Sequence, residues 1–210
     1  MKIKKASFVG SSTTLKGKPL FKAPEIAFIG RSNVGKSSLI NMLCHGAAIE
    51  GKGGELARTS SSPGKTIAVN HFLINDSWYL VDLPGYGYAK LSKTQIAELA
   101  KMNNEFINSS EQLATLFVLI DGRHPLQRID SEFITSLGRA QIPFAIILTK
   151  ADKLSKNEIS KNFTQIKNEL LKQWEELPPI FLSSATTHLG KEEILNYIEQ
   201  VITLYKNSNK

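Results

Sequence analysis

The chain is poor in cysteine, in histidine and in long apolar runs, and each shortage excludes a class of protein. Cys44 is its single cysteine, which excludes an internal disulfide. The longest near-apolar stretch, residues 113–120, is far shorter than the roughly 18 to 20 residues of a membrane span, and no signal-length apolar stretch follows the N-terminal lysines. The histidines lack the spacing of zinc ligands; they are His45, His71, His124 and His188. We expect a cytoplasmic protein with no membrane contact.

Acidic residues are absent from the first 24 positions, which hold six lysines. The whole chain has a net charge of +7, and removing this segment leaves twenty basic against nineteen acidic residues, a net charge of +1. Such a segment can contact RNA phosphates or simply be solvated, and charge alone leaves both readings open. With 210 residues, we expect a basic N-terminal arm over residues 1–22, one domain over residues 23–206 and a short tail over residues 207–210.

The rest of the chain alternates short apolar runs with helical patterns, which predicts a mainly parallel α/β sheet. Two helices begin with a capping box, Ser92 with Gln95 and Ser155 with Glu158. The six predicted strands are Glu25–Ile29, Ile67–Ile74, Tyr79–Val81, Thr115–Ile120, Phe144–Leu148 and Ile180–Leu182. The five predicted helices start near Lys36, Ser92, Arg128, Ser155 and Lys191. Residues 46–65 break this rhythm with Gly, Ser, Thr and Pro, so they form a candidate switch loop.

A phosphate-binding loop lies between the first predicted strand and the first predicted helix. Residues 30–37 read GRSNVGKS, which fits G-x-x-x-x-G-K-[ST]. Its backbone N–H groups can surround phosphate oxygens, Lys36 can reach the β and γ phosphates, and the Ser37 hydroxyl can bind Mg²⁺. The predicted phosphate-binding residues are Gly30, Arg31, Ser32, Asn33, Val34, Gly35, Lys36, Ser37 and Ser38.

Three further motifs each follow a predicted strand and indicate which nucleotide binds. Asp82 can hold Mg²⁺ through water, and the Gly85 N–H can meet a γ phosphate. Asp152 can accept two N–H bonds from guanine, whereas adenine offers the opposite pattern and would leave this carboxylate unpaired at about 1–3 kcal/mol or more. The three motifs are Asp82, Leu83, Pro84 and Gly85; Thr149, Lys150, Ala151 and Asp152; and Ser183, Ser184 and Ala185, whose backbone can contact the base oxygen.

The order of these motifs resembles that of a Ras-like P-loop NTPase, with a mostly parallel six-stranded sheet flanked by helices on both faces. That resemblance implies that Thr66, after Gly64 and Lys65, completes the Mg²⁺ shell when a γ phosphate is present. It also implies that Lys36, Thr66 and Gly85 act in catalysis, and that Ser37, Thr66 and Asp82 serve the metal.

Three departures from the Ras-like pattern refine this prediction. Tyr86 stands where a water-orienting glutamine is usual, so we expect slow intrinsic hydrolysis. Asn33 resembles the asparagine that helps some bacterial GTPases bind K⁺ beside the phosphates. Thr149 replaces the commoner asparagine, which puts that asparagine's contacts in doubt while leaving Asp152 in place.

Longer segments resemble a narrower group, the EngB (YihA/YsxC) family within the TrmE-Era-EngA-EngB-septin-like GTPases. They are residues 30–41, GRSNVGKSSLIN; 57–60, ARTS; 63–66, PGKT; 82–90, DLPGYGYAK; 121–125, DGRHP; and 149–154, TKADKL. The match covers about residues 20–205. It implies a Mg²⁺-dependent, monomeric GTPase that binds GTP and GDP, serves assembly of the large ribosomal subunit and supports cell division and septation. Under this resemblance, the basic arm is a candidate rRNA contact.

Two other functions compete with that of a ribosome-associated switch. A P-loop kinase needs a lid with arginines over the phosphates, and neither Arg123 nor Arg139 lies in an evident lid. A GTP-binding scaffold with negligible turnover is the second, because Tyr86 is compatible with it.

Overall fold

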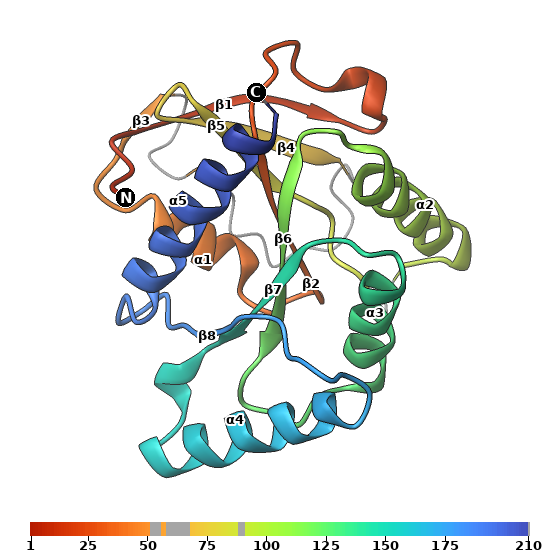
Figure 1. Cartoon of the computed structure of the whole chain (residues 1–210), viewed down its shortest axis with the longest axis vertical. Helices are drawn as coiled ribbons and strands as arrows, with labels where there is room; N and C mark the ends of the chain where they lie inside the picture. The colour runs from red at the N-terminus through yellow and green to blue at the C-terminus, as the bar shows by residue number, and fades with distance from the viewer. Residues whose placement is uncertain (51–55, 58–67, 88–90, 210) are drawn as a thin grey trace.

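A computed structural model of the chain describes residues 1–50, 56–57, 68–87 and 91–209, which form one mixed sheet with helices on both faces (Figure 1). The strands are β1 (Lys5–Ser12), β2 (Glu25–Gly30), β3 (Ala48–Glu50), β4 (Val69–Ile74), β5 (Trp78–Asp82), β6 (Leu113–Asp121), β7 (Phe144–Thr149) and β8 (Ile180–Leu182). The helices are α1 (Lys36–Leu43), α2 (Lys93–Ser109), α3 (Arg128–Arg139), α4 (Lys156–Leu171) and α5 (Lys191–Ser208). Short 3-10 helices occupy Leu15–Gly17 and Ala151–Lys153. The predicted α/β class is confirmed.

The strand order is β3-β1-β4-β5-β2-β6-β7-β8. β4 runs antiparallel to both β1 and β5, and the other pairs are parallel. The carboxyl ends of β2, β5, β6, β7 and β8 therefore meet at one edge of the sheet. Ligands of open α/β sheets bind outside these strand ends, which is where the predicted motifs lie.

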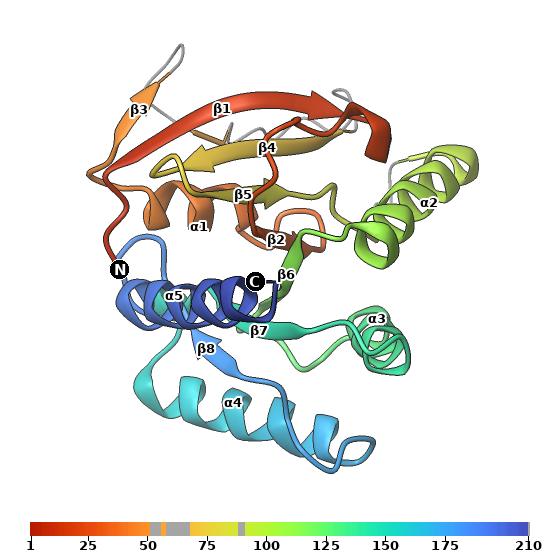
Figure 2. The ribbon, with the colours of Figure 1, turned by 45° about the horizontal axis from the view of Figure 1, so that its top comes forward.

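Two apolar cores lie between the sheet and its helices, one on each face of the sheet. The central strands are therefore buried on both faces. All six residues of β2 and of β7 are buried. One core contains side chains of α1 and α5, and the other contains side chains of α2, α3 and α4. Figure 2 shows α1 and α5 on one side of the sheet and α2 and α3 on the other. Phe28 and Phe117 stack in the first core, with ring centroids 5.0 Å apart. Within the described ranges, no helix is both long enough and apolar enough to cross a membrane.

The predicted starts of α2 and α4 are confirmed at the level of individual bonds. The Ser92 hydroxyl accepts from the Gln95 N–H at 3.2 Å, and the Gln95 side chain accepts from the Ser92 N–H at 3.0 Å. Ser155 and Glu158 form the same reciprocal pair. Each capping box satisfies N–H groups that have no partner inside the helix, which fixes where the helix begins.

Among the described residues the sheet has eight strands, not the six predicted. β3 has three residues and pairs with β1 only over Lys5–Ser7. β1 lies in the segment expected to be a basic arm, and it pairs with β4 from Ala6 to Ser12, with a register shift between Phe8 and Gly10. Neither strand could be predicted from the sequence. Both lie at a border of the sheet, where few side chains are buried, and a bulge disrupts the alternation of apolar and polar residues. At the other end, α5 extends to Ser208, into the expected tail.

A buried ion pair fixes the N-terminal segment to the rest of the domain. Lys18 Nζ lies 2.7 Å from Glu25, whose carboxylate also accepts from Ser110 Oγ at 2.6 Å and lies 3.6 Å from His71. Burial by itself would raise the pKa of Glu25, but the contacts with His71, Lys18 and Ser110 outweigh burial and lower it. The residues of the predicted basic N-terminal arm are therefore partly built into the fold.

Candidate functional site

The phosphate loop has the backbone geometry that its glycines predict. Gly35 has φ +101° and caps α1, a conformation that side-chain-bearing residues rarely adopt. A Cβ at Gly30 would lie 2.8 Å from the Leu119 carbonyl oxygen, so a larger residue does not fit there. Asn33 also has a positive φ, +62°, and Val34 is buried beneath the turn. The loop therefore reverses the chain at the N-terminus of α1, where N–H groups have no helical partner and favour anions.

The predicted phosphate lysine and the predicted magnesium carboxylate lie together. Lys36 Nζ donates to Asp82 Oδ1 and forms an ion pair with it. Asn70 on β4 donates to the other carboxylate oxygen of Asp82 at 3.4 Å. Asn70 could not be predicted from the sequence, because its place opposite Asp82 depends on the β4–β5 register.

The same residues suit a hard cation. The Ser37 hydroxyl, half exposed at the start of α1, and the Asp82 carboxylate are oxygen ligands of the kind that Mg²⁺ prefers. Within the described part of the chain, no group of three or more His, Cys, Asp and Glu side chains gathers to hold a metal. Mg²⁺ is commonly held by one or two protein groups together with substrate phosphates, so this sparse donor set fits it.

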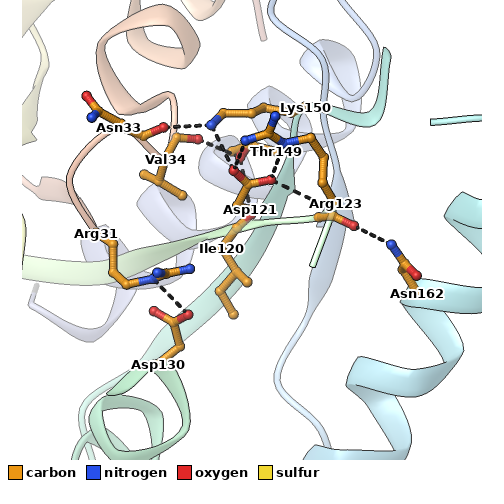
Figure 3. Close-up of polar contacts among 11 residues, drawn as sticks. Arg31, Asn33, Val34, Ile120, Asp121, Arg123, Asp130, Thr149, Lys150 and Asn162 are labelled. Carbon is orange, nitrogen blue, oxygen red and sulfur yellow. Dashed lines mark hydrogen bonds and ion pairs between the residues drawn. The ribbon is translucent and has the colours of Figure 1, made fainter. Parts of the chain in front are cut away.

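The base-side motif, residues 149–152, is bonded directly to the phosphate loop. Thr149 Oγ1 donates to the Val34 carbonyl oxygen at 2.6 Å, and Lys150 Nζ donates to the Asn33 carbonyl oxygen at 2.6 Å (Figure 3). Thr149 thus supplies a bond to the phosphate loop from the position where asparagine is commoner.

Asp152 faces the loop that follows β8. Its carboxylate accepts from Ser184 Oγ at 2.8 Å, and its other oxygen lies 3.1 Å from Lys153 Nζ. The hydrogen bond from Ser184 is the main cause that lowers the pKa of Asp152, and the contact with Lys153 adds to it. Asp152 is therefore an anion at neutral pH. The Ala151 N–H donates to the Ser183 carbonyl oxygen at 3.1 Å, which joins the two loops. Ser183 and Ser184 are buried, and the adjacent Ala185 is half-buried.

The segment after β5 is held between the phosphate loop and α2. Leu83 is fully buried, Pro84 accepts a bond from Asn103 at 2.9 Å, and the Tyr86 N–H donates to the Gly30 carbonyl oxygen at 3.2 Å. Gly85 lies between these anchored residues. The catalytic roles predicted for Gly85 and Lys36 stay predictions.

Tyr86 is bound to a buried carboxylate. Its hydroxyl donates to Asp130 Oδ1 at 2.9 Å, while Arg31 Nε donates to Asp130 Oδ2 at 3.1 Å. Burial raises the pKa of Tyr86, as does the nearby Asp130, and burial likewise raises the pKa of Asp130 against the effect of its two donors. Sequence reasoning missed Asp130 because acidic residues are common in the first turn of a helix.

Replacing Tyr86 with phenylalanine tests whether this hydroxyl has a structural role. We expect the free energy of unfolding to fall by about 1–3 kcal/mol, because Asp130 loses one of its two side-chain donors while buried. GTP turnover should stay within about twofold, since the hydroxyl is already committed to Asp130. Urea denaturation and single-turnover hydrolysis measure the two quantities. A tenfold slower turnover with unchanged stability would instead place the hydroxyl in the chemistry.

Part of the predicted switch lies outside the described residues. The ranges that the structure does not describe include Gly64, Lys65 and Thr66, and also residues 88–90. The last described residue before this segment is Ala57, whose N–H and carbonyl oxygen both bond to the Asn41 side chain at 2.9 Å. Asn41 on α1 therefore anchors the chain between the phosphate loop and the predicted switch threonine.

Comparison with known proteins decides the family. A family model described as "50S ribosome-binding GTPase" matches residues 25–150. The "probable GTP-binding protein EngB" of Porphyromonas gingivalis is 54% identical over 201 residues, covering 96% of each chain. The chain belongs to the EngB family. The EngB protein of Bacteroides thetaiotaomicron is 52% identical over 208 residues, covering 99% of this chain and 100% of that one.

Solved structures agree with this family at the level of fold. A crystal structure of an EngB protein aligns with a TM-score of 0.60 and 25% identity, covering 85% of this chain and 98% of that one. Era, solved in complex with MgGDPNP and 16S rRNA nucleotides, aligns with a TM-score of 0.64 over 86% of this chain and 57% of Era, at 22% identity. This member of the EngB family is therefore a GTP-binding GTPase with a Ras-like fold, and the resemblance read from its motifs is confirmed.

Proposed function

We propose that this GTPase is a cytoplasmic nucleotide switch in the assembly of the large ribosomal subunit, and that it supports cell division and septation through that role. The observation that carries the nucleotide part is that Lys36 pairs with Asp82 beside the phosphate loop, to which the base-side motif of Asp152 is bonded through Thr149 and Lys150. The family description, a 50S ribosome-binding GTPase, supports the ribosomal part.

In this proposal, the chain holds the nucleotide at both ends. N–H groups of residues 30–38 and the Lys36 ammonium bind the β and γ phosphates, and Asp152 accepts the two N–H bonds of guanine. Ser37 and Thr66 would hold Mg²⁺ directly, and Asp82 would do so through water. The ion, when bound, neutralises charge on the β and γ phosphate oxygens. Without phosphate, Lys36 and Asp82 compensate each other's charge as an ion pair. A bound phosphate replaces Asp82 as the partner of Lys36.

Slow intrinsic turnover belongs to the same proposal. Tyr86 is bonded to Asp130 and cannot orient a water as a glutamine does. Asn33 has an exposed side chain and is the proposed K⁺ ligand beside the phosphates. Equal rates of single-turnover hydrolysis in potassium and in sodium would refute that role for Asn33.

The ribosomal role is tested by cosedimentation with isolated large subunits in a non-hydrolysable GTP analogue, in GDP and without nucleotide. We expect stronger binding with the analogue, because a switch can shift binding only by the difference between its states. Binding that is equal in all three conditions would contradict the switch, and no binding would contradict the ribosomal partner.

The same experiment, repeated at several salt concentrations, tests whether the N-terminal lysines contact RNA phosphates. Two of the six are engaged internally, Lys5 with Asp76 and Glu50, and Lys18 with Glu25. The exposed four are Lys2, Lys4, Lys16 and Lys22. Replacing these four with glutamine should reduce the salt slope of binding by about three, as expected for four lost phosphate contacts.

A variant with the same charge change serves as the control. It carries glutamine at four exposed helix lysines, Lys93, Lys101, Lys156 and Lys161. If both variants reduce the slope equally, net charge rather than the N-terminal segment determines binding.

A further inference from the structure

The Asp121-Gly122-Arg123 segment has no part in the function described so far. Asp121 is the last residue of β6 and pairs in register with Thr149 of β7. Its side chain is 9% exposed and lies beside the base-side motif (Figure 3). A buried carboxylate is costly unless it is paired, so its partners indicate what it does.

Two cations share the Asp121 carboxylate. Arg123 approaches it side-on, with Nε 2.9 Å from Oδ1 and Nη2 2.8 Å from Oδ2, and the Arg123 N–H adds a bond of 3.2 Å to Oδ1. Lys150 Nζ donates to Oδ2 at 2.8 Å. Burial opposes ionisation, but the donors from Arg123 and Lys150 together hold the pKa of Asp121 well below its usual range.

Lys150 is thereby fixed at both ends. Its backbone has φ +63°, and its ammonium bonds to Asp121 and to the Asn33 carbonyl oxygen. The stem passes over the phosphate loop, where a Cβ at Gly35 would lie 3.8 Å from Lys150 Cε. A free lysine side chain loses conformational entropy when it is ordered, so fixing the stem beforehand favours any ligand that packs on it.

The turn that carries Arg123 is itself held firmly. The Gly122 N–H donates to the Thr149 carbonyl oxygen at 3.0 Å, and the Gly122 carbonyl oxygen accepts from Asn162 on α4 at 3.0 Å. A Cβ at Gly122 would lie 3.0 Å from that Thr149 oxygen, which favours glycine. The turn thus places Arg123 against Asp121 from a fixed position.

We propose that Asp121 is a positioning residue for the nucleotide base: with Arg123 behind it, Asp121 holds the Lys150 stem as the surface on which the purine packs. This inference rests on the proposed guanine site. It predicts a contribution to affinity that depends on the presence of a base but not on the 2-amino group that Asp152 reads.

The test uses the full chain with Asp121 replaced by asparagine, and calorimetric titrations with GDP, IDP and inorganic triphosphate in Mg²⁺. IDP lacks the 2-amino group, and triphosphate lacks the base. We expect Kd to rise about tenfold for GDP and for IDP alike, and less than twofold for triphosphate. Failure of the unsubstituted chain to bind GDP would refute the proposed function itself, which separates the two claims.

Other patterns would overturn the inference. Equal weakening for all three ligands would mean a general disturbance of the loops, a larger effect on GDP than on IDP would mean an effect through Asp152, and no change would mean no role.

Arg123→Ala keeps the proposal testable if the Asp121 variant fails to fold, because it leaves the Lys150–Asp121 pair in place. It should raise Kd about threefold for GDP and IDP and leave triphosphate unchanged; no effect on either nucleotide would count against the proposal. Arg128→Ala is the matched control, since Arg128 pairs with Glu132 on the exposed side of α3 and should change none of the three constants.

Discussion

Replacing Asp152 with asparagine is expected to lower the affinity for GTP by about a thousandfold. Guanine presents two adjacent N–H donors, and each bond to a carboxylate is worth about 1.5–3 kcal/mol. An asparagine amide offers one acceptor and one donor, so one guanine donor would face another donor. The measurement is calorimetric titration with GTP, with circular dichroism confirming that the variant is folded.

The complementary ligand makes this prediction decisive. Xanthine keeps one N–H but carries a carbonyl where guanine has its amino group, which matches an amide. The asparagine variant should therefore bind xanthosine triphosphate more tightly than GTP, while the unsubstituted chain prefers GTP. Equal loss for both nucleotides would show that Asp152 holds the loop through Ser184 rather than reading the base. Lys153→Ala serves as the control, because it removes a partner of Asp152 and leaves the carboxylate.

Replacing Gly190 with alanine is expected to cause the largest loss of stability, about 4 kcal/mol. Gly190 has φ +79° and caps α5, and an added Cβ would lie 2.0 Å from the Leu182 carbonyl oxygen and 3.2 Å from the Leu182 carbonyl carbon. Both atoms are backbone at the end of β8, so neither can move without shifting the loop of Ser183 and Ser184. Urea denaturation followed by circular dichroism measures the change in the free energy of unfolding.

Gly46 provides the matched control for that substitution. It also has a positive φ, +87°, but a Cβ there would meet nothing within 4 Å. Gly46→Ala therefore carries the backbone penalty of about 1–2 kcal/mol without a steric clash. If the two substitutions cost the same, the close approach at Gly190 is relieved by small movements and contributes little.

The sequence predicted the parts of the site that local chemistry determines. The phosphate loop needs glycines at fixed spacing, and Gly35 shows why, with its left-handed backbone at the start of α1. Capping boxes depend on residues three apart, so Ser92 and Ser155 could be read as helix starts. The predicted switch segment around Thr66 lies beyond the described residues and stays a prediction.

Partners that depend on tertiary contacts could not be predicted in the same way. Asn70, Asp121 and Asp130 reach the site only because separate elements meet at one sheet edge. A signal did exist for Asp121: it ends a buried strand, as Asp82 does, and an acid at the carboxyl end of such a strand is a candidate for that reason alone.

The paired N-terminal strand also bears on how the protein is made. β1 bonds to β4, which lies about sixty residues later in the chain, and the Met1 amine bonds to Glu199 in the last helix at 2.8 Å. During synthesis, Met1 therefore waits for Glu199 before this contact can form, since a chain emerges from its N-terminus. β1 can pair with β4 as soon as residue 74 has emerged, whereas the contact between Met1 and α5 can form only after residue 199 has been translated.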